Sequence, residues 1–377
     1  MKRFANFVRK NSQKLPKDIV TIKDVAKRAG VAISTVSSVT NGHNKHVGQA
    51  TREKVLQAIK ELDYRPNAIA RSMVKGTTTT VGLIMSEVSP LFDAVDSGVE
   101  QVLMAEGFQI FMAHAQDYED EERAIETFRS KQVNGFIFMH RSRKAPFDNL
   151  VALKKDNVPF VVINQGLDDS EINQVMFDDF GAGRMGVQHL IHLGHTRIAT
   201  FSGPLNDPQP WNSAQERHRG WLHTIQENHL PVREEWIVRS PYSYEGGYAA
   251  AQEWLQGLKK ERERPTAIFV SNDTMAVGVL KALLEAGLQL PEEMALIAVG
   301  DPPHMAFTYP ATTALELPIM EAGRVAARIL VNWIRNGKPE YAQRVLLSCK
   351  LKVRQSCGAY LLKVHGPDGE SDKLRSA

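Results

Sequence analysis

Apolar residues recur at intervals of three and four positions in three short runs near the start of this 377-residue chain. Residues three and four apart share one face of a helix, so each run has the pattern of a short amphipathic helix. The inward positions are Ile22, Val25, Ala26 and Ala29, then Val36 and Val39, then Val55, Leu56, Ile59 and Leu62. The spacing predicts three helices, over about 22–29, 33–41 and 51–62.

The boundary residues of the first two runs predict how these helices are joined. Thr21 is a typical N-cap residue, and Asp24 three positions later completes a capping box. Gly30 supplies the turn, since a residue without Cβ adopts positive φ readily. Two helices joined by a tight turn form a helix-turn-helix, whose second helix enters the major groove of duplex DNA. The expected partner is therefore double-stranded DNA.

After Gly76 and the threonines at 77–80 the pattern changes to short apolar runs that alternate with amphipathic helices. Near-continuous apolar strands separated by helices are typical of a parallel sheet covered on both faces. About eleven strands exceed one compact sheet, which favours two sheets. The clearest strands are 81–85, 108–113, 135–139, 160–164, 197–203, 267–272 and 295–300, and the helices between them include 94–106, 119–131, 182–193, 215–228, 246–258 and 274–286.

Charge is divided unevenly between these two parts. Residues 1–76 hold 16 Lys and Arg against 5 Asp and Glu, a net +11, so the remainder carries −8 of the total of +3. A basic head joined to an acidic body is the electrostatic pattern of a nucleic-acid-binding module attached to another domain. A solvated charged surface is the plainer interpretation of charge alone, and the helix-turn-helix pattern argues against it.

Several other classes of protein are disfavoured. No run reaches the roughly 18 apolar residues of a membrane span, and residues 1–19 are basic without the apolar segment of a secretion signal. Cys349 and Cys357 are too few for a disulfide framework or a metal site. We therefore expect a reduced, cytoplasmic protein, associated with the nucleoid through DNA, with no membrane contact and no cofactor.

The motifs TIKDVAKRAGV and TREKVLQAIKELDYRPNAIARS resemble those of the lac repressor and galactose repressor family of bacterial transcription regulators. The resemblance covers roughly residues 21–356. It implies an all-α helix-turn-helix head and an α/β body of two Rossmann-like lobes, like a type I periplasmic binding protein. The implied divisions are 1–19 extension, 20–66 DNA-binding domain, 67–76 hinge and linker, 77–356 effector-binding and dimerisation domain, and 357–377 disordered tail. Within the body, lobe 1 would hold 77–176 and 316–340, and lobe 2 would hold 177–315 and 341–356, with chain crossings near Phe177, Ala314 to Glu316, and Tyr341.

The resemblance also assigns DNA contacts by position. It implies that three residues of the second helix face the groove, that four others contact phosphates, and that residues 67–73 form a hinge helix whose side chain wedges into the minor groove. These residues are Ile33, Ser34 and Ser38, then Thr21, Ser37, Asn41 and Tyr64, then Asn67, Ala70 and Met73.

Three positions depart from the family pattern. Ala32 stands where a capping Ser or Thr is usual, which removes a cap worth about 1 kcal/mol. Ser38 stands where Arg is common, and Ser lacks the two-pronged contact that Arg makes to guanine. Met73 replaces the usual Leu wedge, although Met also intercalates. The alternative is that Met73 is a linker residue that does not contact DNA. We expect an operator unlike the family's typical one.

Effector candidates follow from the rule that ligands lie outside the carboxyl ends of parallel strands. They are Phe92, His114, Asn164, Trp211, Arg217, Asn272, Asp273, Asp301 and Glu316. The resemblance places Arg217, Asn272, Asp301 and Glu316 at effector-binding positions. An Arg fork, carboxylates and aromatic faces suit a carbohydrate.

Plainer roles stand beside these. Asp273 is a candidate cap for a helix starting at Thr274, Trp211 a packing residue, and His114 an ordinary strand-end histidine. Arg217 needs either an effector or an internal carboxylate, because an unpaired buried Arg is costly. The segment GDPPHMAF has one acid after its strand where relatives often have two, which puts the chemistry at Asp301 in doubt.

The expected function is a DNA-binding repressor that binds a pseudo-palindromic operator as a homodimer under control of a small molecule, with a carbohydrate as the favoured class. The alternatives are a purine effector or a protein co-repressor and, from other classes, a carbohydrate-binding enzyme or a solute receptor. No phosphate-binding loop, nucleophile elbow or metalloprotease motif supports an enzyme. The glycine-rich GAGRMG at 181–186 is more typical of helix packing.

Overall fold

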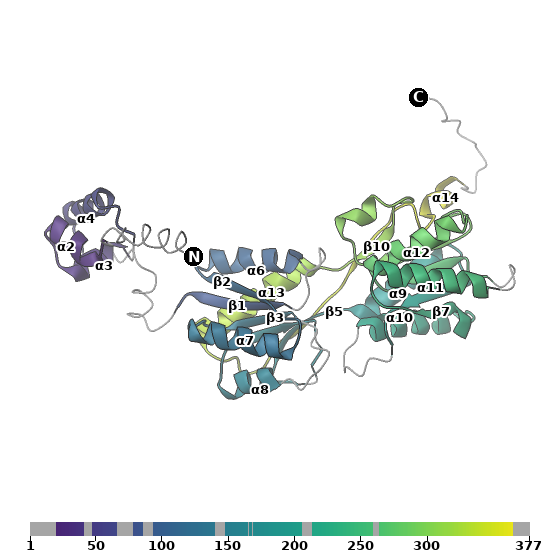
Figure 1. Ribbon diagram of the computed structural model, residues 1–377, viewed down its shortest axis with the longest axis horizontal. Helices are drawn as coiled ribbons and strands as arrows, with labels where there is room; N and C mark the ends of the chain where they lie inside the picture. Colours follow the sequence, from purple (N-terminus) through teal and green to yellow (C-terminus); the bar gives the residue numbers. More distant parts are fainter. Residues whose placement is uncertain are drawn as a thin grey trace, which may run out of the picture. The chain divides into compact units, whose positions relative to one another are not determined.

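The computed structural model describes residues 20–40, 47–65, 78–85, 93–139, 148–164, 166–167, 169–205, 213–258 and 264–364 (Figure 1). The chain divides into two compact units, one up to Thr78 and one from Thr79 onwards. We call them the head and the body, and each is described by itself.

The head contains the three helices that the sequence predicts: α2 (Ile22–Ala29), α3 (Ile33–Thr40) and α4 (Gln49–Glu61). They enclose a small apolar core formed by the inward positions of all three helices together with Tyr64. The buried members are Val25, Ala26, Val36, Val39, Val55, Ala58 and Tyr64. Helical periodicity predicted this core because each helix turns only one face inward. Leu56 is the exception: it was expected to point inward but is 47% exposed, and Ala58 is buried on α4 instead.

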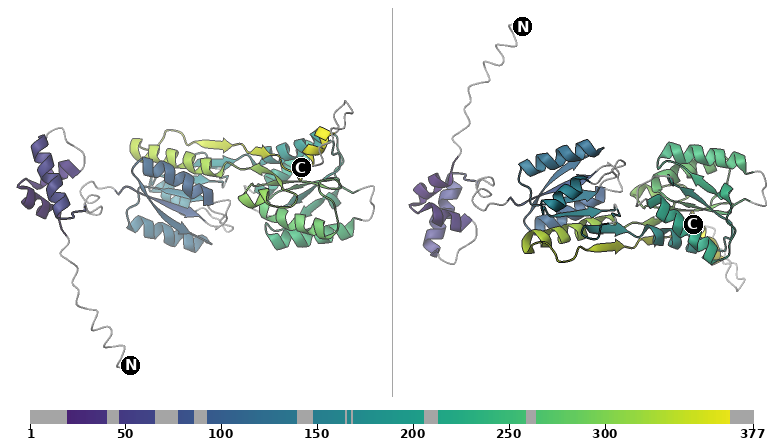
Figure 2. Two further views of the ribbon diagram at one scale, coloured as in Figure 1. Left: turned by 90° about the horizontal axis from the view of Figure 1, so that it is seen from above. Right: turned by 90° about the horizontal axis from the view of Figure 1, so that it is seen from below.

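The first sheet of the body has six strands in the order β11-β5-β4-β3-β1-β2, and every paired strand is parallel. Its strands are β1 (Thr80–Met85), β2 (Gln109–His114), β3 (Phe136–Met139), β4 (Phe160–Ile163), β5 (Asn173–Phe177) and β11 (Arg344–Leu347). Its helices are α6 (Asp93–Ala105), α7 (Tyr118–Ser130), α8 (Asp148–Lys155) and α13 (Ile319–Asn336). Helices cover both of its faces (Figure 2).

The second sheet also has six strands, in the order β12-β10-β9-β8-β6-β7, and only the β10–β12 pair is antiparallel. Its strands are β6 (Ile198–Ser202), β7 (Ile237–Arg239), β8 (Ala267–Val270), β9 (Ala295–Val299), β10 (Thr313–Glu316) and β12 (Lys350–Lys352). Its helices are α9 (Asp179–His192), α10 (Ser213–Glu227), α11 (Tyr244–Gly257), α12 (Asp273–Glu285) and α14 (Ala359–Val364), with short 3-10 turns η2 (Glu234–Trp236) and η4 (Pro303–Ala306).

One apolar cluster continues across both sheets of the body. It joins buried residues of β1 and α13 to residues of α9, α10 and β8, whereas the opposite face of each sheet has its own cluster. The buried strands consist almost entirely of apolar residues, as expected for sheets covered on both faces. The two-sheet α/β body and the helical head are the fold class that the sequence predicted.

The chain crosses between the sheets three times, and the third crossing differs from expectation. The first follows β5 and the second follows β10, at the ends expected from the sequence. The third was expected near Tyr341, but β11 still pairs with β5 in the first sheet, so the crossing falls between Leu347 and Lys350. Residues 344–347 alternate between exposed and half-buried positions. An edge strand of this kind lacks the continuous apolar pattern that marks the central strands.

The segment from residue 357, expected to be a disordered tail, begins as ordered structure. Cys357 is buried with its Sγ 3.5 Å from His189 Nε2, and α14 follows at Ala359–Val364. Tyr360 donates its hydroxyl to Glu292 at 3.3 Å. The sequence did not reveal these contacts because they join residues far apart in the chain. The extension 1–19 and residues 365–377 lie outside the described residues.

Three structural features are absent from the described residues. No helix there is long and apolar enough to cross a membrane. Within the same ranges, no group of three or more His, Cys, Asp or Glu side chains is arranged to hold a metal ion. Cys349 and Cys357 are both buried and are not joined by a disulfide.

Candidate functional site

In the head, the turn between α2 and α3 positions the second helix of the predicted DNA-binding motif. Gly30 has φ +66°, the left-handed conformation that a tight turn requires, and Val31 donates its N–H to the carbonyl of Ala26 at 3.1 Å. Val36 and Val39 then anchor α3 to the core. The structure therefore forms the predicted helix-turn-helix.

Anchoring α3 in this way determines which of its side chains remain accessible. Ile33 is 45% exposed and Ser34 is exposed, whereas Ser37 and Ser38 are half-buried. An exposed β-branched residue at the start of the helix is suited to contact thymine methyl groups, and a serine hydroxyl is suited to hydrogen-bond base edges. Of the three predicted groove-facing residues, Ile33 and Ser34 are thus the more accessible.

The residues predicted to contact phosphates occupy different environments. The Asp24 carboxylate accepts hydrogen bonds from the backbone N–H of Thr21 at 2.8 Å and from its hydroxyl at 2.7 Å, which confirms the predicted link between cap and third helical residue. These bonds lower the pKa of Asp24. Tyr64 packs into the head core and is 9% exposed. Asn41, Asn67, Ala70 and Met73 lie outside the described residues.

In the body, a buried ion pair lies where the chain first crosses between the sheets. Arg217 on α10 donates to Asp179 Oδ1 from Nε at 2.8 Å and from Nη2 at 2.7 Å, and to the carbonyl of Ser271 from Nη1 at 2.6 Å. The side chains of Arg217 and Asp179 are 7% and 0% exposed. From the sequence, two partners were possible for Arg217, an effector or an internal carboxylate. In the structure its partner is the internal carboxylate of Asp179.

Close packing of α9 on α10 sets this geometry. A Cβ at Gly183 would lie 2.3 Å from the carbonyl oxygen of Arg217, and one at Gly220 would lie 2.2 Å from that of Phe180. Only glycine allows the two backbones to approach so closely. The glycines of the GAGRMG segment thus serve helix packing, as predicted, and they bring the start of α9 to the Arg217 side chain.

Asn272 and Asp273 follow β8 and begin α12. The Asn272 side chain accepts from the N–H of Met275 at 3.0 Å, so Asn272 is the N-cap. The alternative role of Asp273 as the cap is therefore wrong, because the helix begins one residue earlier than expected. Asp273 is buried instead, and burial raises its pKa. We refer to Asp179, Arg217, Ser271, Asn272 and Asp273 as the Arg217 cluster.

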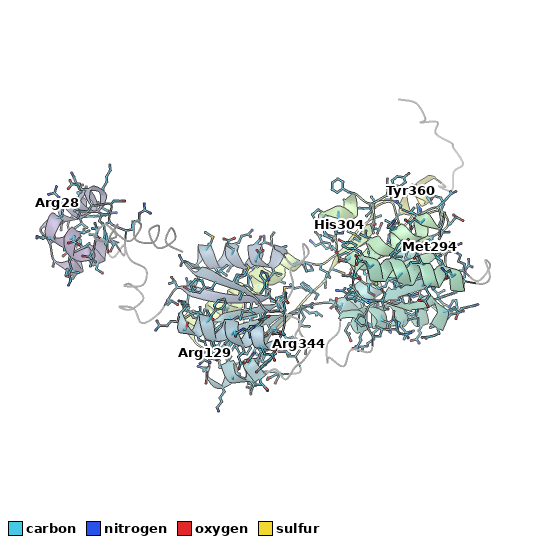
Figure 3. All side chains as sticks on the ribbon, viewed as in Figure 1. Arg28, Arg129, Met294, His304, Arg344 and Tyr360 are labelled. Atoms are coloured by element: carbon cyan, nitrogen blue, oxygen red, sulfur yellow. The ribbon has the colours of Figure 1, made fainter. Side chains whose placement is uncertain are left out.

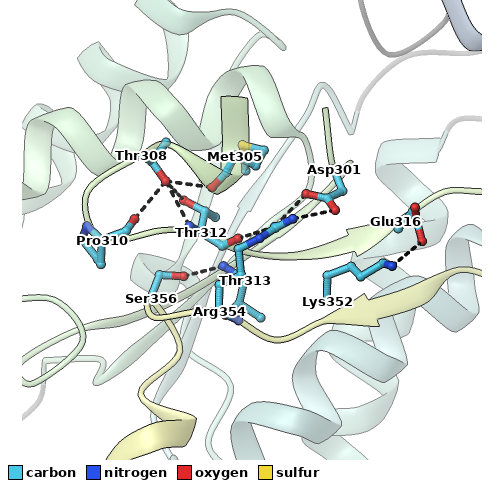
Figure 4. Close-up of polar contacts among 10 residues, drawn as sticks. All are labelled: Asp301, Met305, Thr308, Pro310, Thr312, Thr313, Glu316, Lys352, Arg354 and Ser356. Carbon is cyan, nitrogen blue, oxygen red and sulfur yellow. Dashed lines mark hydrogen bonds and ion pairs between the residues drawn. The ribbon is translucent and has the colours of Figure 1, made fainter. Parts of the chain in front are cut away.

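Two further ion pairs hold the remaining predicted acids of the second sheet (Figure 4). The Asp301 carboxylate accepts hydrogen bonds from both terminal nitrogens of Arg354, Nη1 at 2.7 Å and Nη2 at 2.9 Å. Glu316 lies 3.3 Å from Lys352 Nζ on the antiparallel partner strand. Both basic residues belong to the segment that enters the second sheet after the third crossing. We call these the two outer ion pairs.

In the first sheet, the candidates are separated. His114 ends the edge strand β2 and is exposed. Asn164 follows β4 with φ +57°, and its backbone N–H donates to Val175 at 2.8 Å. A non-glycine residue in this conformation is a form of strain that concentrates at functional sites. Phe92 and Trp211 lie outside the described residues.

Some buried polar atoms lack a hydrogen-bond partner among the described residues. They include Asp179 Oδ2, Ser271 Oγ, Asn164 Oδ1 and His304 Nε2. A buried polar atom without a partner costs about 1–3 kcal/mol. Two of the four belong to the Arg217 cluster, so this cluster has hydrogen-bonding capacity that the described chain does not use.

Sequence reasoning missed the partners of the predicted residues. Asp179, Ser271, Lys352 and Arg354 were not among the candidates. Asp179 carried the clearest signal, because two acids at the start of a helix after the strand 173–177 place a carboxylate at a sheet end. Lys352 ends the short edge strand β12 and Arg354 follows it, and nothing in their local sequence indicates acids 36 and 53 positions away.

Comparison with known proteins defines the class first. The model for "Bacterial regulatory proteins, lacI family" matches residues 21–67, and that for "Periplasmic binding protein-like domain" matches residues 187–357. Catabolite control protein A of Priestia megaterium is 35% identical, over 89% of this chain and 99% of that protein. The HTH-type transcriptional repressor PurR of Haemophilus influenzae (strain PittEE) is 33% identical, over 91% of this chain and all of that protein. These matches define a DNA-binding transcriptional regulator.

Solved structures agree with this class. The lac repressor dimer bound to operator and the anti-inducer ONPF matches with a TM-score of 0.76 at 26% identity, over 90% of this chain and 99% of that one. The transcriptional regulator CelR–cellobiose complex matches with a TM-score of 0.66 at 31% identity, over 89% and 99%. The chain belongs to the lacI family of bacterial regulatory proteins, and it is a DNA-binding transcriptional repressor of that family.

Proposed function

We propose that this repressor binds a pseudo-palindromic operator as a homodimer and is controlled by a carbohydrate that binds at the Arg217 cluster. The observation that carries the effector site is the pair of fully buried atoms without partners, Asp179 Oδ2 and Ser271 Oγ. Both belong to the cluster at the carboxyl ends of the second sheet, where ligands of open α/β sheets bind. Hydroxyl groups of a sugar supply the donors that these atoms lack.

Relatives support the carbohydrate class. One solved neighbour is a complex with cellobiose, and a LacI family regulator from Enterococcus faecium carries bound ribose. The PurR relatives make a purine the second candidate, and a protein co-repressor remains a further alternative. Asn272, Asp301, Glu316 and Asn164 remain proposed effector residues, as do His114, Phe92 and Trp211.

DNA binding is proposed to rest on the exposed start of α3. Ile33 and Ser34 would read bases, and the hinge with Asn67, Ala70 and Met73 would enter the minor groove. One short helix-turn-helix reads a half-site, so a homodimer would bind two half-sites in inverted order. A protein that acts on chromosomal DNA works in the cytoplasm, at the nucleoid.

Exposed apolar side chains on the body support the homodimer. Phe307 and Tyr309, just after η4, are 86% and 85% exposed, and Phe111 and Met112 of edge strand β2 are also exposed. Large exposed apolar groups of this kind mark protein–protein interfaces. A lac repressor dimer is among the structural neighbours.

The dimer is tested by sedimentation velocity of a Phe307→Ser, Tyr309→Ser variant. The expected result is a shift toward monomer and a loss of operator affinity, because each half-site contact alone is weak. Val151→Ser on α8 is the control, since Val151 is exposed but far in sequence from the proposed interface. An unchanged dimer in the double variant would refute this interface.

The effector site is tested with the full-length protein and an operator selected from a randomised duplex library. Thermal unfolding is measured with sugars and purines, and operator release is measured by fluorescence anisotropy. Ser271→Ala removes a hydroxyl without breaking a hydrogen bond among the described residues, so it should weaken the effector response and preserve the fold. Ser130→Ala on α7 serves as control. A full response in Ser271→Ala would remove the cluster from the effector site.

A further inference from the structure

The basic side chains of the Arg217 cluster and of the two outer ion pairs are already paired with carboxylates of the chain. Arg217 is held by Asp179, Arg354 by Asp301 and Lys352 by Glu316, with closest distances of 2.7, 2.7 and 3.3 Å. Burial lowers the pKa of Arg217 and the Asp179 carboxylate raises it, with a net increase that keeps the guanidinium charged. Each cation thus has its own carboxylate.

The neighbouring histidine adds no charge. His218 follows Arg217 on α10, and its Nδ1 lies 3.3 Å from Ser202 Oγ at the end of β6. Burial lowers the pKa of His218 below its ordinary value of 6.5, so the ring is neutral at pH 7. It provides hydrogen-bonding capacity but no positive field for an anion.

The helix N-termini at this site are also occupied. The N-terminus of a helix binds anions through its free N–H groups. At α9 the carboxylate of Asp178 accepts from Gly181 N at 2.8 Å, and at α12 the Asn272 side chain fills the equivalent position. Asp179 and Asp273 are the first residues of the two helices. The chain's own acidic and amide side chains therefore take the positions that a phosphate would need.

Asp273 adds to the cluster a buried carboxyl group that has no cation of its own. It is 4% exposed, and its Oδ1 accepts only from Asn272 Nδ2, at 3.1 Å, among the side-chain bonds of the described residues. It lies against Gly300, where a Cβ would be 2.9 Å from Oδ1, so it faces the end of β9 from which Asp301 extends. Asp273 therefore offers an incoming anion no positive charge.

The buried atoms of the cluster that lack a partner can accept hydrogen bonds from a ligand. Asp179 Oδ2 accepts only, and Ser271 Oγ both accepts and donates. Asn164 Oδ1, which follows β4 of the first sheet and is not part of the cluster, is another acceptor without a partner in the described ranges. Hydroxyl or amino groups supply donors to both atoms of the cluster, and a phosphate dianion supplies none.

We infer that the effector is an uncharged, hydroxyl-rich molecule and that its phosphorylated form is rejected. This inference rests on the proposed effector site, and it further specifies that the ligand carries no charge. A phosphate that leaves water without gaining a cation as partner loses several kcal/mol, and each 1.4 kcal/mol is a factor of ten in affinity. A sugar phosphate should therefore bind at least about tenfold more weakly than its parent sugar.

Matched pairs test the inference on the full-length protein. Ribose with ribose 5-phosphate, glucose with glucose 6-phosphate, and cellobiose are compared by thermal unfolding, since a ligand raises the apparent stability by mass action. The expected result is a rise in Tm with an uncharged sugar and a smaller or absent rise with its phosphate. A phosphate that raises Tm more than its parent sugar overturns the inference. The inference is also overturned if no uncharged sugar in the panel raises Tm while operator binding persists. That result differs from a failure of operator binding, which would contradict the proposed DNA-binding function.

Two variants test the cause. Asp179→Asn leaves the Arg217 charge without its carboxylate, and inorganic phosphate should then raise the Tm of the variant while leaving the wild-type Tm unchanged. Asp156→Asn is the matched control, because it breaks a half-exposed pair with Arg129 of similar length. If Asp179→Asn does not fold, Glu316→Gln frees the partly exposed Lys352 by the same logic. Equal responses of the folded variant, the control and the wild type to phosphate would show that the paired carboxylates do not exclude anions.

Discussion

In the head, the polar side chains at the start of α3 lie at the surface, whereas in the body the charged side chains around the Arg217 cluster are buried in pairs. The head has a core of seven buried apolar residues, and the body has clusters that span two six-stranded sheets. A small core leaves most side chains at the surface and free to read a large, charged polymer. A large core creates the dry interior in which a few polar atoms recognise a small molecule.

The contrast extends to the basic residues themselves. Arg28 of the head projects at the surface, where it pairs with Glu61 at 2.6 Å with 59% of its side chain exposed (Figure 3). Arg217 of the body makes an ion pair of almost the same length with 7% exposed. The two ion pairs therefore contribute differently to the free energy of unfolding although their lengths are similar, because water screens one pair and is excluded from the other. The predictions below test this difference, from the largest expected effect to the smallest.

The largest effect is expected for Arg217→Ala. Removing one partner of a buried ion pair leaves the other charge without compensation, which costs about 3–5 kcal/mol. The Asp179 carboxylate would lose both of its hydrogen bonds from Arg217. Urea denaturation of the body transition should show the loss. A change below 1 kcal/mol would mean that the pair is far better hydrated than its burial indicates.

A buried acid in the first sheet's helices gives the next effect. Glu121 of α7 is 4% exposed and accepts from Asn149 Nδ2 at 3.1 Å. Burial raises its pKa from 4.5 to about 7, and the bond from Asn149 opposes this. Because folding raises this pKa, the associated stability is complete below about pH 4.5 and is lost as the pH rises through about 7.

Glu121→Gln should remove this pH dependence. The amide keeps an acceptor for Asn149 and carries no charge, so the variant should exceed the wild type in free energy of unfolding by about 3 kcal/mol at pH 8. At pH 4 the difference should largely disappear. Glu126→Gln, exposed on the same helix, is the control. Parallel stability curves for Glu121→Gln and the wild type would contradict the burial argument.

A smaller effect is expected in the head from Thr21→Ala. The substitution removes the hydroxyl that donates to Asp24 and weakens the start of α2, at a cost of about 1 kcal/mol. Thermal unfolding of the head should shift downward while the body transition stays unchanged. Thr21→Ser keeps the hydroxyl and is the control. A shift of the body transition would indicate that the two units do not unfold independently.

The smallest effect is expected for Arg28→Ala. Exposed ion pairs contribute about 0.2–1 kcal/mol, so loss of the Arg28–Glu61 pair should barely alter head stability. Its comparison with Arg217→Ala is the direct test of the contrast between head and body. A loss as large as that of Arg217→Ala would show that exposure does not distinguish the two pairs.

The sequence predicted those parts of the fold that depend on periodicity. The helices of the head follow from Val25, Val36 and Val55 at their inward positions, and the central strands follow from unbroken apolar runs such as 135–139. Two interior strands, β5 and β10, were not among the strands named from the sequence. The edge strands β7, β11 and β12 were also missed, because their side chains alternate in exposure or are too few to form a pattern. The edge strand β2 was nevertheless predicted, because residues 108–113 form a longer apolar run.

The candidate site was predicted less completely. Arg217 and Asn272 were identified because they follow strand ends, and Asp301 because it follows β9. Their partners were not, since Asp179 lies 38 positions from Arg217 and Arg354 lies 53 positions from Asp301. Such pairs depend on how α9 packs on α10 and on the path after the third crossing. These are properties of tertiary structure that a single sequence does not display.

The late crossing has a consequence for the order in which the protein can be completed during synthesis. Strand β11 closes one edge of the first sheet and β12 closes one edge of the second, and only two residues separate them. Helix α13, which packs on α6, also follows almost the whole second sheet in the chain. Neither lobe can therefore reach its final form while the ribosome is still translating the other. A chain that stops before β11 would leave both sheets with an uncovered edge, a condition that favours aggregation over partial function.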